Sequence, residues 1–367
     1  MYEASGEMND GKSVSTESIT CSLYTQYGDP IESEECITLR RIVESNGGPG
    51  NFNFEDVYEL LMEIRDYVMG ISEDQDGSMR KTMEACGLKK DATVGYINSL
   101  IDRLLLRVLL SITPYDKKEP PAWFSDFFSR LESLNDDMIS FDFCVLNYDT
   151  WVEKSLNRYN DGFVRAERHP GKPDEYSIFN KTMVTSSDDS NRLCHPHGCV
   201  NYGGHLIEKP HGDAEICLWD RCISVSRNEM QYSEGDSSKP VLSPIVTGKR
   251  KKRNFYYEPF KTYLDLIEGP MASNEIVLII GYGFGDPHIN EIIRKYKRGS
   301  GKHLIVISPF SEKTKEDIRT VCEYDVEQKE GAWTSDDAYA VWFMSGFKEM
   351  TMNDDVIETI RDMAKQH

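Results

Sequence analysis

Long hydrophobic runs and a surplus of basic residues are both lacking in this chain of 367 residues. Its longest apolar stretch, near residues 104–112, contains Arg107, so it is too short and too charged to span a bilayer. Residues 1–20 are polar and acidic, unlike a signal peptide. We therefore expect no membrane segment. Nine cysteines at irregular spacings predict a cytoplasmic protein with free thiols.

The charge balance disfavours a nucleic-acid partner. Lysine and arginine together number 42, aspartate and glutamate 62, and the net charge is −20. Because such an acidic surface repels phosphate backbones, direct binding of nucleic acid is not expected. The basic run Lys249–Arg253 is interpreted either as a solvated loop or as a patch for an acidic partner or a phosphate group.

Helical periodicity dominates the first third of the chain. Asn53 is placed to cap a helix over residues 54–69, whose apolar residues recur at helical spacing. Residues 70–94 are polar and predict a loop. A second helix over residues 96–112 is apolar on most of its circumference, which predicts deep burial, and Pro120 opens a third helix.

Short strands and helices alternate in the rest of the chain. Strands are expected at residues 141–146, 275–280, 303–308 and 339–344, and helices at 152–159, 256–267, 289–297 and 312–322, with a last helix near the end. This alternation predicts an α/β fold with a Rossmann-like parallel sheet, flanking helices and an inserted smaller helical/β module. No repeat is visible, and the expected regions are an irregular N-terminal region (1–50), a helical module (51–135), the Rossmann-like domain (136–310) with a β-rich insertion (about 160–245), and a C-terminal completion of that domain (311–367).

Polar residues follow the first predicted strand. Asn147 and Asp149 stand two positions apart where a parallel strand ends, so both can point into a crevice. An amide can hold a water or a sugar hydroxyl there, and a carboxylate can stabilise developing positive charge. The alternative is an ordinary Asx turn that caps the next helix.

The segment Cys194–Cys199 contains two histidines and two cysteines. A zinc site with Cys217 and Cys222 as further ligands is one interpretation, but the spacing lacks the two close ligand pairs that such sites show. The other interpretation makes His197, beside Gly198, a general base, because imidazole titrates near neutral pH.

The third segment, Gly281–Asp286, is rich in glycine and lies between a strand and a helix. Small residues at such a strand end let a nucleotide approach the backbone, and the helix start offers N–H groups to phosphate. The spacing is neither the dinucleotide fingerprint nor a P-loop.

Taken in this order, the three segments resemble the sirtuin-like superfamily, most closely its bacterial antiphage branch. Leu146–Thr150 matches that family's Asn-x-Asp element, His197–Gly198 its His-Gly element, and Ile280–Asn290 its Gly-Tyr-Ser-Phe-x-Asp-type segment. Ser308 and Pro309 stand where the family has a polar-Pro turn near the adenosine. The resemblance spans about residues 138–310.

The resemblance implies a domain that cleaves the nicotinamide–ribose bond of NAD. Asn147 would position the water or the ribose, His197 would act as base towards a ribose hydroxyl or the water, and Asp149 would hold the ribose environment. The other residues implied at the NAD site are Gly281, Tyr282, Gly283, Phe284, Asp286, Ser308 and Ser5.

Two departures from the family pattern qualify this expectation. A strand ending in Gly-Ala-Gly-x-Ser, which cradles the pyrophosphate in the family, is not found, and Met1–Gly6 look like the residues that follow it. This counts against diphosphate binding by the chain alone. The paired cysteines of deacylase zinc modules are also missing, which favours NAD hydrolysis over deacylation and predicts no bound zinc.

A chain without a large sensor domain resembles the defence members that are encoded beside a HerA-type ATPase. The resemblance implies a hexameric partner of that type, a homo-oligomer with candidate assembly surfaces on the helices of residues 54–135, and NAD depletion during infection of a bacterial cell. Two alternatives stay open: an NAD-dependent protein deacylase, and a non-catalytic nucleotide-binding or scaffold subunit.

Overall fold

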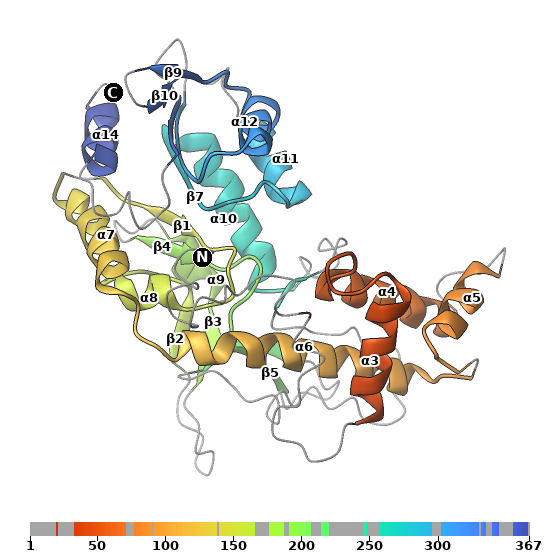
Figure 1. Ribbon diagram of the computed structural model, residues 1–367. Helices are drawn as coiled ribbons and strands as arrows, with labels where there is room; N and C mark the ends of the chain where they lie inside the picture. The colour runs from red at the N-terminus through yellow and green to blue at the C-terminus, as the bar shows by residue number, and fades with distance from the viewer. Residues whose placement is uncertain are drawn as a thin grey trace.

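The protein has an α/β fold, as predicted, with a helical part beside its sheets (Figure 1). The computed structural model describes residues 20, 33–70, 77–89, 91–137, 139–165, 176–186, 191–206, 214–219, 245–247, 257–295, 302–329, 332–334, 340–344 and 355–365. Ser5, Cys222 and the basic run Lys249–Arg253 lie outside these ranges. Across the described ranges, no helix has both the length and the apolar character that crossing a membrane requires.

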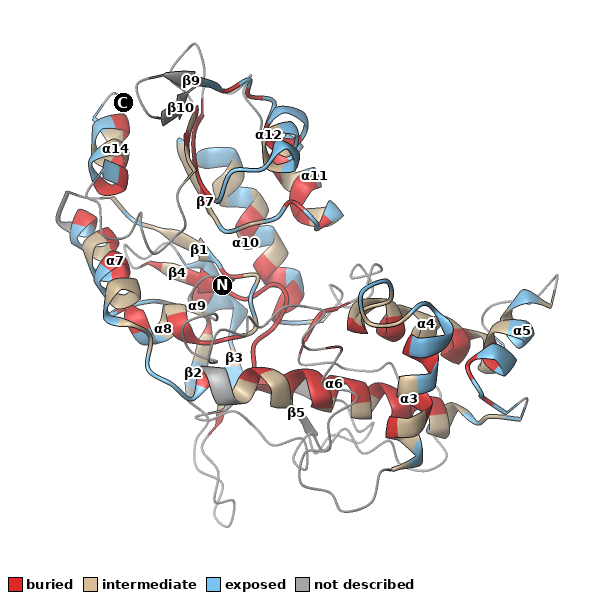
Figure 2. Ribbon diagram, viewed as in Figure 1, coloured by how far each residue is buried: buried red, intermediate tan, exposed pale blue. Residues whose placement is uncertain are grey.

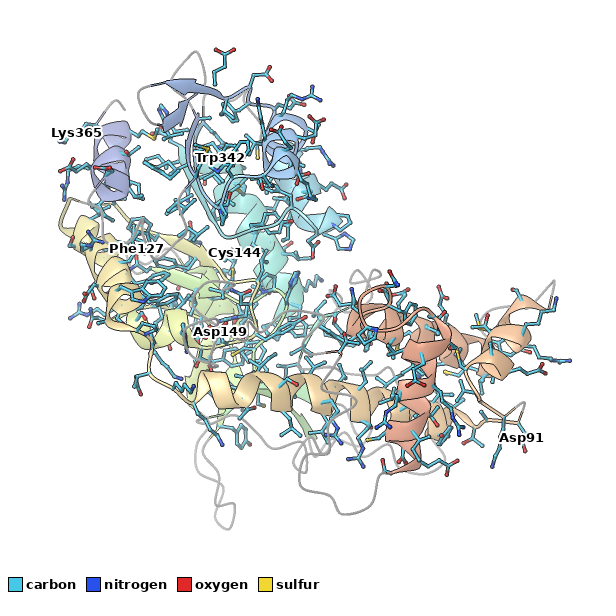
Figure 3. The ribbon with its side chains drawn as sticks, viewed as in Figure 1. Asp91, Phe127, Cys144, Asp149, Trp342 and Lys365 are labelled. Atoms are coloured by element: carbon cyan, nitrogen blue, oxygen red, sulfur yellow. The ribbon has the colours of Figure 1, made fainter. Side chains whose placement is uncertain are left out.

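The helical part is built on the long helix α6 (Val94–Asp116), against which α3 (Glu34–Ser45) and α4 (Phe54–Val68) pack. Asn53 caps α4 as predicted, because its Oδ1 accepts from the backbone N–H groups of Glu55 and Asp56. Figure 2 shows α6 buried along most of its length, and Figure 3 places Asp91 at the tip of this part, far from the sheets.

Two helices were not predicted from the sequence. Helix α3 lies within residues 1–50, where an irregular chain was expected, and Ser33 caps it by accepting from Cys36 N at 3.4 Å. Helix α5 (Ser78–Ala85) lies within the predicted loop and buries only Met83. Helix α5 is polar on most of its surface, so tertiary packing determines it, whereas α3 has an apolar stripe with Leu39, Ile42 and Val43 that the expectation of an irregular region overlooked.

The main sheet has the strand order β7-β8-β11-β10-β9. Its strands are β7 (Ile276–Ile280), β8 (His303–Ile307), β11 (Ala340–Phe343), β10 (Ala332–Thr334) and β9 (Glu327–Lys329). The first three are parallel, and β10 and β9 continue the sheet in antiparallel pairing.

Strand β8 is buried on both faces, as a central parallel strand should be. Leu304 and Val306 pack into one core with α10 (Phe260–Ser273) and α11 (Pro287–Lys295). Ile305 and Ile307 pack into a second core with α7 (Ala122–Ser133) and α14 (Asp355–Ala364). Successive side chains of β8 point to opposite faces of the sheet, so this one strand packs against the helical layers on both sides.

A second parallel pair carries the first two polar segments. Strand β1 (Asp142–Cys144) runs parallel to β4 (Arg192–Cys194). Asn274, at the end of α10, donates from Nδ2 to Asp142 Oδ2 at 3.0 Å and links this pair to the start of β7. All three strands therefore end on the same side of the molecule.

Helix α8 (Trp151–Ser155), which follows β1, is shorter than the predicted 152–159. The helix ends early because the next residues bond to α7 instead. The backbone N–H groups of Asn157 and Arg158 donate to the Glu132 carboxylate. Beyond it the insertion forms an antiparallel sheet with the order β2-β3-β6-β5.

The strands of this insertion are β2 (Phe163–Arg165), β3 (Tyr176–Phe179), β6 (Ala214–Trp219) and β5 (Tyr202–Leu206). Helix α9 (Lys181–Thr185) lies between β3 and β4 in the chain. Towards the C-terminus, α12 (Glu312–Asp317) runs into a π-helical turn at Ile318–Cys322, where a plain helix was predicted.

Candidate functional site

Residues from the three polar segments come together in the structure. His195 Nδ1 lies 3.3 Å from the carbonyl oxygen of Asn147, which joins the His-Gly turn to the turn after β1. His197 Nε2 lies 3.0 Å from Asp286 Oδ2, which joins the His-Gly turn to the glycine-rich loop after β7. The topology thus gathers side chains that are far apart in the sequence.

The turn after β1 has one exposed and one buried polar side chain. Asn147 is exposed, and its amide is accessible to a ligand. Asp149 is buried, and its Oδ1 accepts from the backbone N–H of Trp151 at 3.2 Å. Asp149 therefore forms the Asx turn of the alternative interpretation, at the residue before the N-cap of α8, Thr150.

His197 and Asp286 form a buried pair in which each side chain is 6% exposed. Asp286 Oδ1 accepts from His288 N at 2.9 Å, so the start of α11 holds the carboxylate while its second oxygen lies at ion-pair distance from the imidazole. Since Nε2 faces Asp286, Nδ1 is the ring nitrogen left to accept a proton. A histidine oriented by a carboxylate is the arrangement of a general base. The sequence assigned Asp286 to NAD, and the structure places it against His197.

The glycine-rich loop presents an open backbone surface. Gly281, Gly283 and Gly285 are exposed, and a methyl group on any of them would meet no atom within 4 Å. Gly281 and Phe284 have φ values of +59° and +52°, in the left-handed region. A non-glycine residue there stores strain, which is common at ligand-binding turns.

The inner side of the same loop is fixed by side chains. The Tyr282 hydroxyl donates to Asn290 Oδ1 at 2.8 Å, and Asn290 Nδ2 donates to the carbonyl of Phe284 at 2.8 Å. Phe284 itself is buried. These contacts direct the glycine backbone outward, where it leaves room for a nucleotide.

Ser308 lies at the end of β8, beside the glycine-rich loop. The backbone N–H of Gly281 donates to the carbonyl of Ile307 at 2.9 Å. The Ser308 side chain is buried, and Trp342 Nε1 donates to its Oγ at 3.2 Å. Ser308 is therefore near the expected nucleotide site, with its hydroxyl engaged by the neighbouring strand.

Sequence reasoning missed three residues that border this site. Tyr148 donates from its hydroxyl to the carbonyl of Val246 at 3.4 Å, and Thr247 donates to Glu55 Oε1 at 3.2 Å. Burial and the Glu55 carboxylate raise the pKa of Tyr148. Tyr148 could have been found inside the Asn-x-Asp element, but nothing in the sequence indicates that Glu55 of α4 or Thr247 reaches the site.

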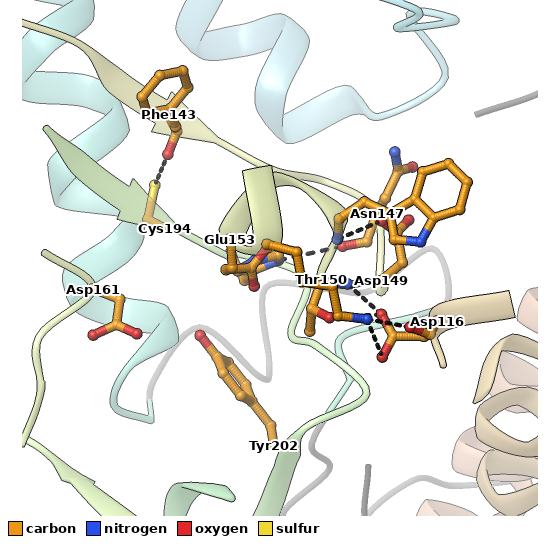
Figure 4. Close-up of polar contacts among 12 residues, drawn as sticks. Asp116, Phe143, Asn147, Asp149, Thr150, Glu153, Asp161, Cys194 and Tyr202 are labelled. Carbon is orange, nitrogen blue, oxygen red and sulfur yellow. Dashed lines mark hydrogen bonds and ion pairs between the residues drawn. The ribbon is translucent and has the colours of Figure 1, made fainter. Parts of the chain in front are cut away.

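A group of acidic side chains lies behind the turn after β1 (Figure 4). Asp116, the last residue of α6, accepts from the backbone N–H and the hydroxyl of Thr150 at 2.6 and 2.8 Å. The pKa of Asp149 is raised to about 6, mainly by burial and also by Glu153 and Asp116, while the Trp151 N–H opposes the shift. The loop that carries Asn147 thus packs against a cluster of acidic side chains, Asp116, Asp149 and Glu153.

His195 is the basic side chain nearest this cluster, and its Nε2 lies 2.7 Å from Glu153 Oε1. Burial lowers the pKa of His195, but Glu153, Asp149 and the Asn147 carbonyl together raise it more, so the net shift is upward. The predicted zinc alternative combined the Cys194–Cys199 segment with Cys217 and Cys222. Cys194 donates to the Phe143 carbonyl at 3.3 Å, Cys217 lies in the insertion on β6, and the two share no ligand cluster among the described residues, outside which Cys222 lies.

The geometry of the candidate site indicates a general class of protein. Exposed polar and glycine-rich turns at the ends of parallel strands, with a buried histidine–carboxylate pair between them, are typical of a nucleotide-binding α/β domain. A family model of the SIR2-like domain matches residues 143–328, from β1 into β9, and the chain belongs to this family. Membership indicates an NAD-related activity. Comparison with curated proteins finds no match.

Proposed function

We propose that the protein is an NAD glycohydrolase, which releases nicotinamide and ADP-ribose and acts in antiphage defence by depleting NAD. The observation that carries the proposal is the His197–Asp286 pair, buried between the Asn147 turn and the open glycine loop. An oriented base, an exposed amide and a backbone surface open to a nucleotide are the parts that such a reaction requires.

In the proposed reaction, the N-glycosidic bond between nicotinamide and ribose breaks and its electron pair leaves with nicotinamide. Water then adds its oxygen to the anomeric carbon. Asn147 orients the water or the ribose, and His197 takes the proton that the water loses. The carboxylate cluster around Asp149 favours the positive charge that develops on the ribose, because fixed charges need no reorganisation when the bond breaks.

The fit to NAD rests on the glycine loop. Side chains at Gly281, Gly283 and Gly285 would occupy open space beside the backbone, and their absence keeps that space for a ligand. The start of α11 lies directly after this loop, and Asp286 already accepts from its first N–H groups. Diphosphate contacts would therefore come from the loop backbone more than from the α11 terminus.

The decisive measurement follows nicotinamide and ADP-ribose when the full chain is mixed with NAD, alone and with a HerA-type ATPase. We expect turnover, and we expect Asn147→Ala and His197→Ala each to reduce it by about 10²-fold or more, with unchanged circular dichroism. Wild-type protein that releases no nicotinamide in either mixture would contradict the proposal.

The alternatives differ in what they need and make. A deacylase forms acyl-ADP-ribose and requires an acyl-lysine peptide, whereas a hydrolase releases ADP-ribose without one. A non-catalytic nucleotide-binding or scaffold subunit binds NAD without turning it over, and calorimetry with NAD distinguishes that outcome.

The proposal includes a HerA-type hexameric partner and a homo-oligomer. Light scattering after size-exclusion chromatography measures both, since a self-associated chain has a mass that is a multiple of 42.1 kDa. Stoichiometric co-elution with the ATPase is the result expected for the complex.

A further inference from the structure

A compact set of metal-binding side chains lies beneath the candidate site. Glu153 of α8, His195 after β4 and Cys199 after the His-Gly turn each bring one ligand atom to a common point, and these atoms lie within 4.8 Å of one another. His195 and Cys199 are 2% and 0% exposed. No other such trio occurs within the ranges that the structure describes.

The trio has unused ligand capacity. Glu153 Oε1 contacts His195, but its Oε2 is buried and has no hydrogen-bond partner in the described part of the chain. A buried carboxylate oxygen without a donor costs free energy, and a cation removes that cost. The free oxygen belongs to the same side chain that already faces the histidine and the cysteine.

The charge around the trio also favours a cation. The carboxylates of Glu153, Asp116 and Asp149 all lie close enough to Cys199 to act on its sulfur. Lys154 compensates only Asp116, to which it lies 3.7 Å away. Negative charge is therefore concentrated at a buried point where the ligands are also gathered.

Neighbouring backbone groups hold two of the ligands in binding orientation. His195 Nδ1 faces the carbonyl of Asn147, which leaves Nε2 as the coordinating nitrogen, and metal-binding histidines usually have such an outer partner. Burial and the neighbouring carboxylates raise the pKa of the Cys199 thiol, and the backbone N–H of Asn201 opposes this shift only in part, so a cation rather than the protein must draw off the thiol proton.

We propose that Glu153, His195 and Cys199 bind one zinc-type divalent cation. Nitrogen and sulfur ligands select a transition metal over magnesium or calcium, and three protein ligands leave a fourth tetrahedral position for water. On binding, the metal replaces the proton on His195 Nε2 and the thiol proton of Cys199, and both protons pass to solvent.

This site takes His195 and Cys199 from the segment that the sequence suggested for zinc, with Glu153 in place of Cys217 and Cys222, and it reverses the expectation that no zinc binds. It would tie α8, which follows Asn147, to the turn that carries His197. Metal binding is a property of the trio itself, so it does not depend on NAD cleavage and is measured without NAD.

The test is a titration of the reduced, chelator-treated full chain with cobalt(II), which absorbs in the near ultraviolet when a thiolate binds it. We expect one cobalt per chain, with the thiolate band displaced by zinc. Cys199→Ser removes the band. Glu153→Gln keeps the shape of the side chain but weakens binding by at least about tenfold.

Cys194→Ser is the matched control, because Cys194 is another buried thiol nearby that donates to a carbonyl outside the trio. It should retain the band and the stoichiometry. Less than one cobalt per wild-type chain, or a thiolate band that survives in a folded Cys199→Ser protein, overturns the proposal. If Cys199→Ser does not fold, unaltered cobalt affinity in Glu153→Gln overturns it as well.

Discussion

Asp286 has two tasks that a single substitution can separate. Its Oδ1 accepts from the start of α11, and its Oδ2 orients His197. In Asp286→Asn the amide oxygen can keep the helix cap, but the amide nitrogen cannot accept from the imidazole. We expect kcat for nicotinamide release to fall about 10²-fold with little change in KM, because the lost contact orients the proposed base.

Asp286→Ala is the comparison for this prediction, since it removes both contacts. It should lose the same activity and, in addition, about 1 kcal/mol of stability through the missing cap. Equal kcat values for Asp286→Asn and the wild type would exclude an orienting role.

Asp149 makes stability depend on pH. Its folded-state pKa is about 6 against an ordinary 3.8, mainly because burial disfavours the charge. A raised carboxyl pKa means that the folded state holds the proton more tightly, so stability falls as pH rises from about 4 to about 6 and stays lower above that range. Asp149→Asn removes this penalty and keeps an oxygen to accept from Trp151.

We expect Asp149→Asn to be more stable than the wild type by about 1–3 kcal/mol near pH 8 and to differ little near pH 4. Urea unfolding at the two pH values measures this. Asp362→Asn, at an exposed position of α14, is the control and should show no such difference. The same stabilisation at both pH values would show that the Asp149 charge is not its cause.

At the scale of elements, the sequence predicted those helices and strands that local capping and hydrophobic spacing determine. The Asn53 cap and the apolar spacing after it predicted α4, and the β-branched run at residues 303–308 predicted β8. The His197–Asp286 contact could not be predicted, because only the packing of β4 beside β1 and of the loop after β7 brings the two residues together. The same holds for Glu55, which reaches the site from another helix.

The insertion depends on one close packing point at Gly162. This residue has a φ of +82°, and a Cβ there would lie 2.7 Å from Phe179 Cε2 and 2.9 Å from Val184 Cβ. Gly162→Ala should therefore destabilise the protein by about 1–3 kcal/mol, through overpacking and backbone strain. Denaturant unfolding measures the change.

Gly95→Ala is the matched control, because Gly95 is an exposed residue of α6 and a methyl group there meets only Thr93 Oγ1, at an ordinary 3.8 Å. Alanine favours helix over glycine, so this variant should gain about 0.5–1 kcal/mol. Opposite signs for the two substitutions would identify packing, rather than the loss of glycine itself, as the cause. A neutral Gly162→Ala would contradict the close approach.

At the scale of the whole molecule, one apolar core connects the helical part to the candidate site. Leu61 of α4 and Leu104 of α6 belong to the same buried cluster as Val200, after the His-Gly turn, and Val306 of β8. The hydrogen bond from Thr247 to Glu55 crosses the same boundary. The division between residues 51–135 and 136–310 stays a prediction, and this core argues that the two parts unfold together.

Leu104→Ala tests that coupling, because the side chain is fully buried and its loss leaves a cavity. We expect a loss of about 2–5 kcal/mol. If the core is cooperative, hydrogen exchange of the most protected amides should accelerate by the same free energy in α6 and in β8, although Leu104 is not part of the sheet. Leu106→Ala, at a half-buried position of the same helix, should cause a smaller change in both elements. Acceleration confined to α6 would instead identify the helical part as a separate folding unit, with the turns of the candidate site supported by the sheets alone.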